Sequence, residues 1–434
     1  MESIWRAGME LPKFQALQGD VKTDVLIIGG GLAGILCAKF LQERGVDYVL
    51  AEGRSICAGV TGNTTAKITS QHGLIYDKML RSKGEELTKM YLDANEAALE
   101  KYAELAKDMD CDFERKNSYV YSLKDTRKLE KEVDALQSIG VGAKLTETGE
   151  LPFLTAGAVC FERQAQFNPL KFVANIAQGL NIYEGTWVRE LTDELAVTNR
   201  GLIYYKRIVF ATHFPIDNKH GMYFLKMYQH RSYVSAYKNA SYVEGMYMDE
   251  SKSGFSFRNY GEYLLVGGGG HRTGKRGGDW QKIRELVGKC YPQAVECFSW
   301  ATQDCMTLDS VPYIGQYSKG LSNCYVATGF NKWGITSSMV SAMILSDMLA
   351  GEESPYAEVF SPSRNMLKPQ LFFNMCESAA NLLTISKKRC PHMGCALKWN
   401  RAEHTWDCPC HGSRFADNGL LLDNPANDNL PHEE

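Results

Sequence analysis

Near the N-terminus, apolar and polar positions follow the order strand, helix, strand. Residues 23–28 are an apolar, β-branched run, which predicts a buried strand. Residues 35–44 have apolar positions at helical spacing, and residues 46–50 return to a short apolar run. This order predicts a βαβ unit with a parallel sheet, and therefore an α/β domain.

A glycine-rich turn joins the first predicted strand to the helix. Gly29 permits the tight turn, Gly31 lets the backbone approach a pyrophosphate, and Gly34 lets the helix pack closely on the strand. Leu32 and Ala33 complete the turn at the start of the helix, whose positive end attracts phosphate. The motif Gly-x-Gly-x-x-Gly thus lies in the structural context that dinucleotide binding requires.

An acidic residue, Glu52, follows the second predicted strand. A carboxylate at this place accepts hydrogen bonds from ribose hydroxyls and repels a 2′-phosphate. Together with the glycine turn, it predicts a dinucleotide site. The alternative is a glycine-rich turn that binds no ligand.

The middle of the chain predicts further helices and a sheet. Residues 76–110 have the composition and spacing of one long helix, or two. Asn168 followed by Pro169 predicts a helix start, with Asn as the cap and Pro in the first turn. Alternating runs between residues 181 and 263 predict a sheet, and residues 254–272 predict a hairpin.

Composition limits the function classes. A chain of 434 residues predicts two or three domains, and its net charge of −3 gives no indication of nucleic acid or of an anionic membrane surface. The N-terminus lacks a signal-peptide pattern, and the longest apolar run, Val25–Ala38, is too short to span a bilayer. Nine of the thirteen cysteines are scattered in mostly apolar strings, as buried thiols of a cytoplasmic protein would be.

Two cysteine–histidine loops lie near the C-terminus. They are Cys390-Pro-His392-Met-Gly-Cys395 and Cys408-Pro-Cys410-His411-Gly-Ser413. Two thiolates with two neutral imidazoles are the ligand set of a Rieske [2Fe–2S] centre. Four such ligands also suit tetrahedral zinc. The spare cysteine in each loop has no use in a zinc finger, so the iron–sulfur interpretation is favoured.

This pattern closely resembles the Rieske family. The resemblance implies that Cys390 and Cys408 bind one iron, and that His392 and His411 bind the other. It also implies a disulfide between the two spare cysteines, Cys395 and Cys410. Ser413 stands where the family has a hydroxyl that donates to a sulfur atom. Phe415 stands where high-potential members have a tyrosine, which implies a potential below the top of the family range.

The preceding part resembles FAD-dependent oxidoreductases of the D-amino-acid oxidase-like class, whose known members include glycine and sarcosine oxidases. The resemblance rests on the glycine motif and on three later segments: residues 59–67, 309–315 and 324–336. It implies contacts to the pyrophosphate or flavin ring from Thr64 and Thr65. It also implies that adenine is bound by the backbone of Val188 and that the flavin ring is bound by Gly329, Gly334 and Thr336. Some sarcosine-oxidase relatives have a substrate-binding lysine in place of Thr336.

The resemblance also implies that an arginine of the predicted hairpin holds a substrate carboxylate. Arg258 and Arg272 are the candidates, and His271 is a candidate base. The alternative for the arginines is a solvated or salt-bridged side chain, since arginine is mostly a surface residue. For His271 the favoured interpretation is a polar residue at the end of a strand, without a catalytic role. The same interpretation is favoured for Tyr228, His230 and Tyr233.

The predicted architecture is α/β: an FAD-binding Rossmann-like domain, an α+β substrate domain and a small β-rich Rieske lobe. The oxidoreductase part covers residues 1–360, with nucleotide-binding parts at about 20–75, 185–215 and 305–350 and substrate-domain parts at about 76–184 and 216–304. Residues 361–389 are predicted to be a helical connector, and residues 390–434 a reduced Rieske module. The connector helix, residues 371–385, is expected to dock its apolar face on the FAD domain.

The predicted function is oxidation of an amine or amino acid by FAD, with single electrons passing to the cluster and on to an unidentified acceptor. One alternative is a plain oxidase that reduces O₂ and keeps the cluster as a structural relic. The other is a redox sensor or electron carrier without amine turnover. We expect no nucleic-acid partner and no membrane span.

Overall fold

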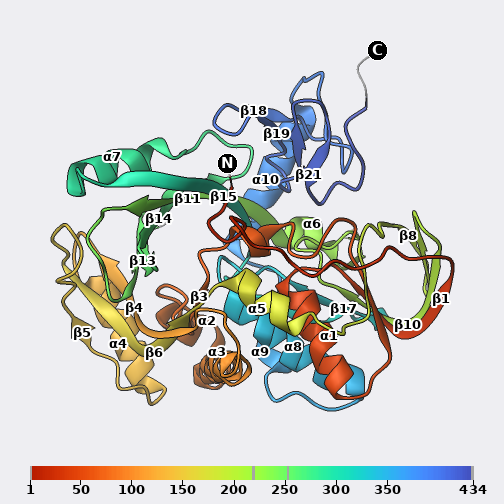
Figure 1. Ribbon diagram of the computed structural model, residues 1–434, viewed down its shortest axis with the longest axis horizontal. Helices are drawn as coiled ribbons and strands as arrows, with labels where there is room; N and C mark the ends of the chain where they lie inside the picture. Colours follow the sequence, from red (N-terminus) through yellow and green to blue (C-terminus); the bar gives the residue numbers. More distant parts are fainter. Residues whose placement is uncertain (1, 218–219, 252–253, 432–434) are drawn as a thin grey trace.

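The computed structural model describes residues 2–217, 220–251 and 254–431, so the last three residues of the predicted Rieske module lie outside the described residues. Within these ranges the strands form three sheets. Figure 1 shows most of the helices in the lower part of the view and a small C-terminal lobe projecting at the top. The α/β class with a β-rich lobe is confirmed.

The first large sheet contains the strands of the predicted nucleotide-binding part. Its strand order is β16-β17-β10-β1-β2-β7, and all neighbouring pairs are parallel except β16–β17; β8 and β9 extend it beside β10. The helices α1 and α8 pack on it, as the near-continuous apolar strands require. The bounds are β1 (Val21–Ile28), α1 (Leu32–Glu43), β2 (Tyr48–Ala51), β7 (Ile182–Tyr183), β8 (Val188–Leu191), β9 (Leu195–Thr198), β10 (Leu202–Phe210), β16 (Tyr313–Ser318), β17 (Leu321–Thr328) and α8 (Gly334–Ala350).

The second large sheet has the order β15-β11-β14-β13-β12-β4-β6-β3, with β5 paired to β6. The predicted hairpin is present as the antiparallel pair β13–β14. The bounds are β3 (Lys67–Ile68), β4 (Glu114–Ser122), β5 (Leu145–Thr146), β6 (Gly157–Gln166), β11 (Met227–Lys238), β12 (Met246–Asp249), β13 (Ser256–Tyr260), β14 (Tyr263–Arg272), α7 (Gln281–Cys290) and β15 (Val295–Thr307).

The helical segments follow the sequence pattern closely. Two helices, α2 (Tyr76–Lys83) and α3 (Glu85–Ala106), meet at Gly84, whose φ of +84° breaks the helical path. The helix α5 (Pro169–Ile176) begins as predicted, because Asn168 Oδ1 accepts hydrogen bonds from two backbone N–H groups of the first turn. The shorter helices are α4 (Arg127–Ser138), α6 (Tyr223–Lys226) and α9 (Ala357–Phe360).

The C-terminal lobe is an antiparallel meander, β18-β19-β20-β21, that follows the helix α10 (Pro369–Leu383). Its strands are β18 (Lys398–Asn400), β19 (Thr405–Asp407), β20 (Arg414–Ala416) and β21 (Leu421–Asp423). The prediction that α10 docks its apolar face is wrong. The helix buries Asn374 and Asn381, whereas Phe372 and Phe373 are exposed.

Candidate functional site

A cavity of about 640 Å³ is lined by residues of both large sheets. This volume is typical of a ligand or cofactor site. Among the predicted FAD contacts, most line the cavity: Gly29, Gly31, Leu32, Ala33, Glu52, Thr64, Thr65, Val188 and Gly334.

The three motif glycines have different surroundings. At Gly29, with φ +111°, a Cβ would lie 2.5 Å from the Ala211 carbonyl oxygen. At Gly34, a Cβ would lie 2.0 Å from the Gly29 carbonyl oxygen, so the close packing of helix on strand needs glycine. A Cβ at Gly31 would meet only Thr61 Oγ1, at 3.5 Å. Gly31 therefore faces open space at the positive end of α1, where a pyrophosphate fits.

Glu52 is held at the edge of this turn by the backbone. Its Oε2 accepts from the Gly30 N–H at 2.7 Å, and its Oε1 accepts from the Arg54 N–H at 2.8 Å. These bonds fix the carboxylate beside the glycine turn, where the sequence predicts the ribose contact.

Three of the predicted FAD residues do not line the cavity: Gly34, Gly329 and Thr336. The Thr336 hydroxyl is buried and donates to the Thr69 carbonyl at 2.9 Å, while Thr336 Oγ1 accepts from the Thr69 N–H at 3.1 Å. This side chain therefore ties α8 to the segment after β3. The Thr336 hydroxyl therefore connects two segments of the fold and does not point into the cavity.

The substrate candidates of the hairpin also lie outside the cavity lining. Arg272 Nε donates to the Pro409 carbonyl at 3.2 Å, and its Nη2 donates to the Cys410 carbonyl at 3.1 Å. Arg272 thus binds the second cysteine–histidine loop, and its assignment as a carboxylate ligand stays a prediction. His271 stacks on the Tyr233 ring, with ring centroids 5.8 Å apart.

Arg258 is fully buried behind the cavity. Its Nη1 donates to the Ala66 carbonyl at 2.8 Å, and its guanidinium lies 5.3 Å from the Trp5 ring centroid. Its Nε and Nη2 make no hydrogen bond within the described ranges. Burial lowers the pKa of this guanidinium to about 9.

Several charged or titratable residues of the cavity were not among the predicted contacts. Lys67 is half-buried on β3, and desolvation, followed by the nearby Arg258 charge, lowers its pKa to about 7. Burial also lowers the pKa of His213 and of Lys332, and it raises the pKa of Asp304. These four residues come from separate segments, so only the folded sheets bring them together. Tyr228, His230 and Tyr233 also line the cavity.

The two cysteine–histidine loops have the same backbone hydrogen bonds. Each first cysteine donates its N–H to the carbonyl five residues later, Cys390 to Cys395 and Cys408 to Ser413. The N–H four residues later donates back to that cysteine's carbonyl, at 2.8 Å from Gly394 and 2.9 Å from Gly412. Both glycines have positive φ, +76° and +86°. The two loops therefore have the same backbone conformation, and each residue of one loop has a structural equivalent in the other.

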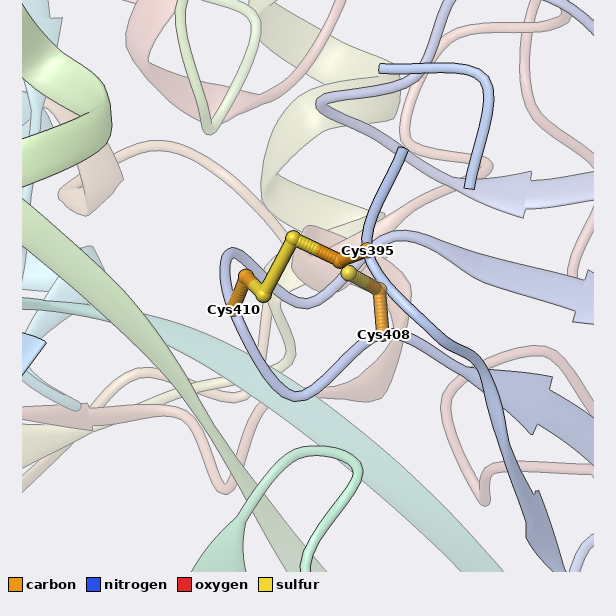
Figure 2. A group of neighbouring side chains, drawn as sticks. All are labelled: Cys395, Cys408 and Cys410. Atoms are coloured by element: carbon orange, nitrogen blue, oxygen red, sulfur yellow. A yellow bond between two sulfur atoms is a disulfide. The ribbon is translucent and has the colours of Figure 1, made fainter. Parts of the chain in front are cut away.

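A disulfide joins the two loops. Cys395 and Cys410 are bonded, with their Cα atoms 6.7 Å apart, and Figure 2 shows the Cys408 side chain beside them. The three sulfur atoms lie within 4.8 Å of one another. Because a disulfide sulfur does not act as a thiolate ligand, this pair ties the loops together and leaves Cys408 for metal binding.

The remaining donors fit a Rieske cluster. The hydrogen bond between the Cys390 and Cys408 sulfurs lowers the pKa of Cys390 and raises that of Cys408, so the pair holds one proton and Cys390 is the first thiolate to form. The rings of His392 and His411 lie 5.0 Å apart. Burial lowers the pKa of His411 to about 3, and neither of its ring nitrogens makes a hydrogen bond within the described part of the chain. A neutral, unengaged imidazole is the form that ligates a metal.

The lobe also forms part of the cavity wall. Its contributing residues are Leu421, Leu422, Asp423, Asn424, Ala426 and Asn427. Gln229 of β11 connects the two sites: its Nε2 donates to the His411 carbonyl at 2.9 Å, and its Oε1 contacts the cavity-lining His213 Nε2 at 3.0 Å. The ligand loop can approach Gln229 because Gly412 has no side chain, since a Cβ there would lie 2.5 Å from the Gln229 Cβ.

A buried ionic network fastens the lobe to β11. Arg231 binds Glu403, with Nε–Oε1 at 2.8 Å, and Arg414 binds the same carboxylate at 2.8 Å. Arg414 also pairs with Asp407 and Asp423, at 3.1 and 3.0 Å. Burial alone would raise the pKa of Glu403, but the hydrogen bond and charge of Arg231 outweigh it, so the pKa is lowered.

The chain matches two protein families. Residues 24–348 match the family described as FAD dependent oxidoreductase, and residues 370–433 match the Rieske [2Fe-2S] domain. A protein of Bacillus subtilis (strain 168), named as the Rieske 2Fe-2S iron-sulfur protein YhfW, is 33% identical over 488 residues, covering 98% of this chain and 96% of the relative. The cytochrome b6-f complex iron-sulfur subunit of Synechococcus sp. (strain JA-3-3Ab) is 49% identical over 37 residues, covering 8% of this chain and 22% of that protein.

Solved structures share the fold of the larger part. L-proline dehydrogenase from P. horikoshii has a TM-score of 0.67 and 18% identity, covering 80% of this chain and 98% of that one. Glycine oxidase from Geobacillus kaustophilus has the same TM-score and identity, covering 79% of this chain and 99% of that one. L-amino acid deaminase from Proteus vulgaris has a TM-score of 0.64 and 15% identity, covering 82% and 100%.

Proposed function

Because the chain belongs to the FAD-dependent oxidoreductase family and carries a Rieske [2Fe–2S] domain, we propose that it oxidises an amine or amino acid and passes the electrons through the cluster to an external acceptor. Its cofactors are FAD and a [2Fe–2S] cluster. When bound, FAD would supply hydride acceptance and the cluster would supply one-electron transfer. The structures with the same fold are titled as enzymes that act on proline, glycine and L-amino acids, which favours this substrate class.

The shared wall between the cavity and the lobe carries the proposal. Residues 421–427 of the lobe include six that line the cavity, so the two sites adjoin each other. The side chain of Gln229 connects cavity-lining His213 to the backbone of His411 through two hydrogen bonds. Such a short, bonded connection favours electron transfer from one site to the other, and a structural relic would not need it.

On the substrate side, we assign Lys67 as the cation that faces an amino-acid carboxylate. It lines the cavity, and Arg258 behind it adds a buried positive charge. Because its pKa is about 7, the ammonium form is lost as the pH rises through that value. We therefore expect KM for an anionic substrate to rise above about pH 7, and Lys67→Met to raise KM and remove this pH dependence. An unchanged pH profile in Lys67→Met would contradict the assignment.

The central test is anaerobic mixing of the holoenzyme with amines, amino acids and N-methyl amino acids. We expect bleaching of the flavin near 450 nm, followed by the appearance of the Rieske electron paramagnetic resonance signal of the reduced cluster. Gln229→Leu should slow the second event and leave the first unchanged. Flavin bleaching while the cluster stays oxidised, with flavin reoxidation once O₂ is admitted, would favour the oxidase alternative. Cluster reduction without amine turnover would favour the carrier. Zinc in place of iron would contradict the cluster.

A pair of glycine variants tests the FAD placement. Gly31→Val should fold but lose FAD, because its side chain enters the space left for the pyrophosphate. Gly34→Val is the matched control: its Cβ would overlap the Gly29 carbonyl, so it should destabilise the protein with or without FAD. Flavin content and the urea midpoint separate the two effects. Stoichiometric flavin in Gly31→Val would show that the phosphate site is elsewhere.

A further inference from the structure

The helix α10 presents an apolar face to solvent. We call this surface the outer face of α10; its members are Phe372, Phe373, Met375, Cys376, Ala379, Ala380 and Leu383, and all are exposed. The exposed fractions are 66% for Phe372, 62% for Phe373 and 84% for Leu383. Leu367 and Ile385 extend the face beyond both helix ends, at 81% and 98%. A contiguous apolar stripe of this kind marks an interaction surface.

Polar contacts fix the orientation of the helix. Asn374 Nδ2 donates to the Leu225 carbonyl at 3.1 Å, and its Oδ1 accepts from Arg272 Nη1 at 3.0 Å. About two turns further along the helix, the Asn381 carbonyl accepts a hydrogen bond from the Ala396 N–H at 3.1 Å. Because these buried bonds lie on the inner side, rolling the helix to bury its apolar face would break them.

Cations flank the outer face at both ends. Lys368 precedes the helix, and Lys387, Lys388 and Arg389 follow it. Between residues 367 and 389 the only carboxylate is Glu377, which is ion-paired with Lys275 at 2.6 Å and is only 15% exposed. The segment is therefore cationic, although the whole chain has a net charge of −3. The overall charge gave no indication of this local surface.

We propose that the outer face of α10 lies in the headgroup region of an anionic lipid bilayer. Apolar side chains on one face with cations at its ends are typical of helices that lie in a membrane interface. At 15 residues, α10 is too short to cross the bilayer, and no helix within the described ranges is long and apolar enough to do so. The helix would lie on the membrane surface, which needs no span.

A second copy of the chain fits this face less well. If two such helices paired about a two-fold axis, each cationic end would face a cationic end of the other copy, whether they ran parallel or antiparallel. Like charges at such distances repel. Anionic lipid headgroups instead complement both ends at once.

The proposal concerns the position of the protein and does not depend on the flavin reaction. The first cluster loop follows α10 within seven residues, and in it Pro391 is exposed and His392 is half-buried. His411, in contrast, is buried against Phe214 and Phe224. Binding of α10 to a bilayer would therefore bring the solvent-accessible side of the cluster loops toward the membrane.

The test is co-sedimentation of the holoprotein with vesicles of phosphatidylcholine alone or mixed with phosphatidylglycerol. We expect binding to the anionic vesicles that weakens with salt. Phe372→Ser with Leu383→Ser should lower the partition constant about ten-fold or more, because apolar contact contributes to interfacial binding. The matched control is Leu154→Ser, at a leucine that is 95% exposed elsewhere on the chain, and it should have no effect.

A second pair of variants tests the charges. Lys368→Glu with Lys387→Glu should also lower the partition constant about ten-fold or more on anionic vesicles. Lys282→Glu with Lys289→Glu, on α7, makes the same charge change at exposed positions and should have a smaller effect. The proposal would be overturned if the protein bound no vesicles. It would also be overturned if the α10 variants and their control variants bound anionic vesicles equally well. Self-association in analytical ultracentrifugation that Phe372→Ser with Leu383→Ser abolishes would also overturn it, and would assign the face to a second copy.

Discussion

Two apolar helices, α8 and α10, use their side chains in opposite ways. In α8, side chains are buried around most of the circumference, including Val340, Ile344 and Leu345 at 0% exposure. In α10, the buried side chains are Asn374 and Asn381, and the apolar ones face solvent. An apolar helix is therefore buried only where other elements surround it. The sequence of the helix alone does not determine which of its sides is covered.

The same contrast extends to the two regions that contain these helices. The nucleotide-binding part is held by apolar contacts between α8, α1 and the first large sheet. The lobe is held on β11 by ion pairs and by the amide side chain of Gln229, and the Asn424 amide of the lobe donates to the Thr212 carbonyl after β10. Apolar packing tolerates small shifts, whereas polar contacts fix orientation, so the lobe is docked in one defined position.

The largest expected effect is on the ionic network of the lobe. Arg231→Ala leaves Glu403 buried with one partner fewer, and should lower the free energy of unfolding by about 3–5 kcal/mol. The control is Arg284→Ala, which breaks a more exposed pair with Glu296 and should cost about 0–1 kcal/mol. Urea denaturation measures both, and equal losses would show that the network does not hold the lobe.

A pair of leucine truncations compares the two helices directly. Leu345→Ala in α8 should lower the free energy of unfolding by about 2–5 kcal/mol, because it opens a cavity in a closed core. Leu383→Ala in α10 should change it by no more than about 0.5 kcal/mol, because the side chain is already exposed. A large loss in Leu383→Ala, measured without lipid, would mean that the outer face of α10 is covered by the protein itself.

The buried side chain of Asn374 should contribute more to the free energy of unfolding than the exposed aromatic side chains of α10. Asn374→Ala removes a donor to Leu225 and an acceptor for Arg272, which should cost about 1–3 kcal/mol. The control, Asn175→Ala on α5, removes an exposed side-chain bond to Lys171 and should cost about 0–0.5 kcal/mol. Thermal unfolding of the two variants ranks them, and the reverse order would contradict the polar docking of α10.

Acid should destabilise the docking of the lobe more than the α8 core, because the lobe is held by carboxylates and the core by apolar contacts. At neutral pH this is the smallest of the expected effects. The folded pKa of Glu403 lies below its unfolded value of about 4.3, so its contribution is fully present above that pH and is lost as the pH falls through the folded pKa. Limited proteolysis should therefore release the lobe in acid before the α8 core unfolds. Glu403→Gln should weaken this pH dependence, and an unchanged profile would point to other groups.

Local signals in the sequence predicted much of the fold. The glycine turn, the Asn168 cap and the hairpin each depend on neighbouring residues only, and the structure has all three. The two cysteine–histidine loops also follow from local spacing, and the structure bonds the predicted disulfide partners, Cys395 and Cys410.

What the sequence could not supply depends on contacts between distant segments. Arg272 was a candidate for substrate binding, but its partners, Pro409 and Cys410, lie about 140 residues later and only the docked lobe places them beside it. Lys67 and Asp304 were not among the predicted site residues. They lie on β3 and β15, the two ends of the strand order in the second large sheet, and both line the same cavity. The amphipathic pattern of α10 gave two faces but no indication of which one would be covered.

The lobe's contribution to the cavity wall has a consequence for assembly. The wall of the cavity proposed to hold FAD is complete only after residues 421–427 have been synthesised and the lobe has docked. Flavin loading and lobe docking are therefore linked: each strengthens the other by the same free energy, as reciprocity requires. Maturation would then have an order, with the flavin entering while the lobe is open and the docked lobe closing behind it. A shortage of flavin during growth would accumulate chains whose lobe is exposed to proteases, even where iron is plentiful.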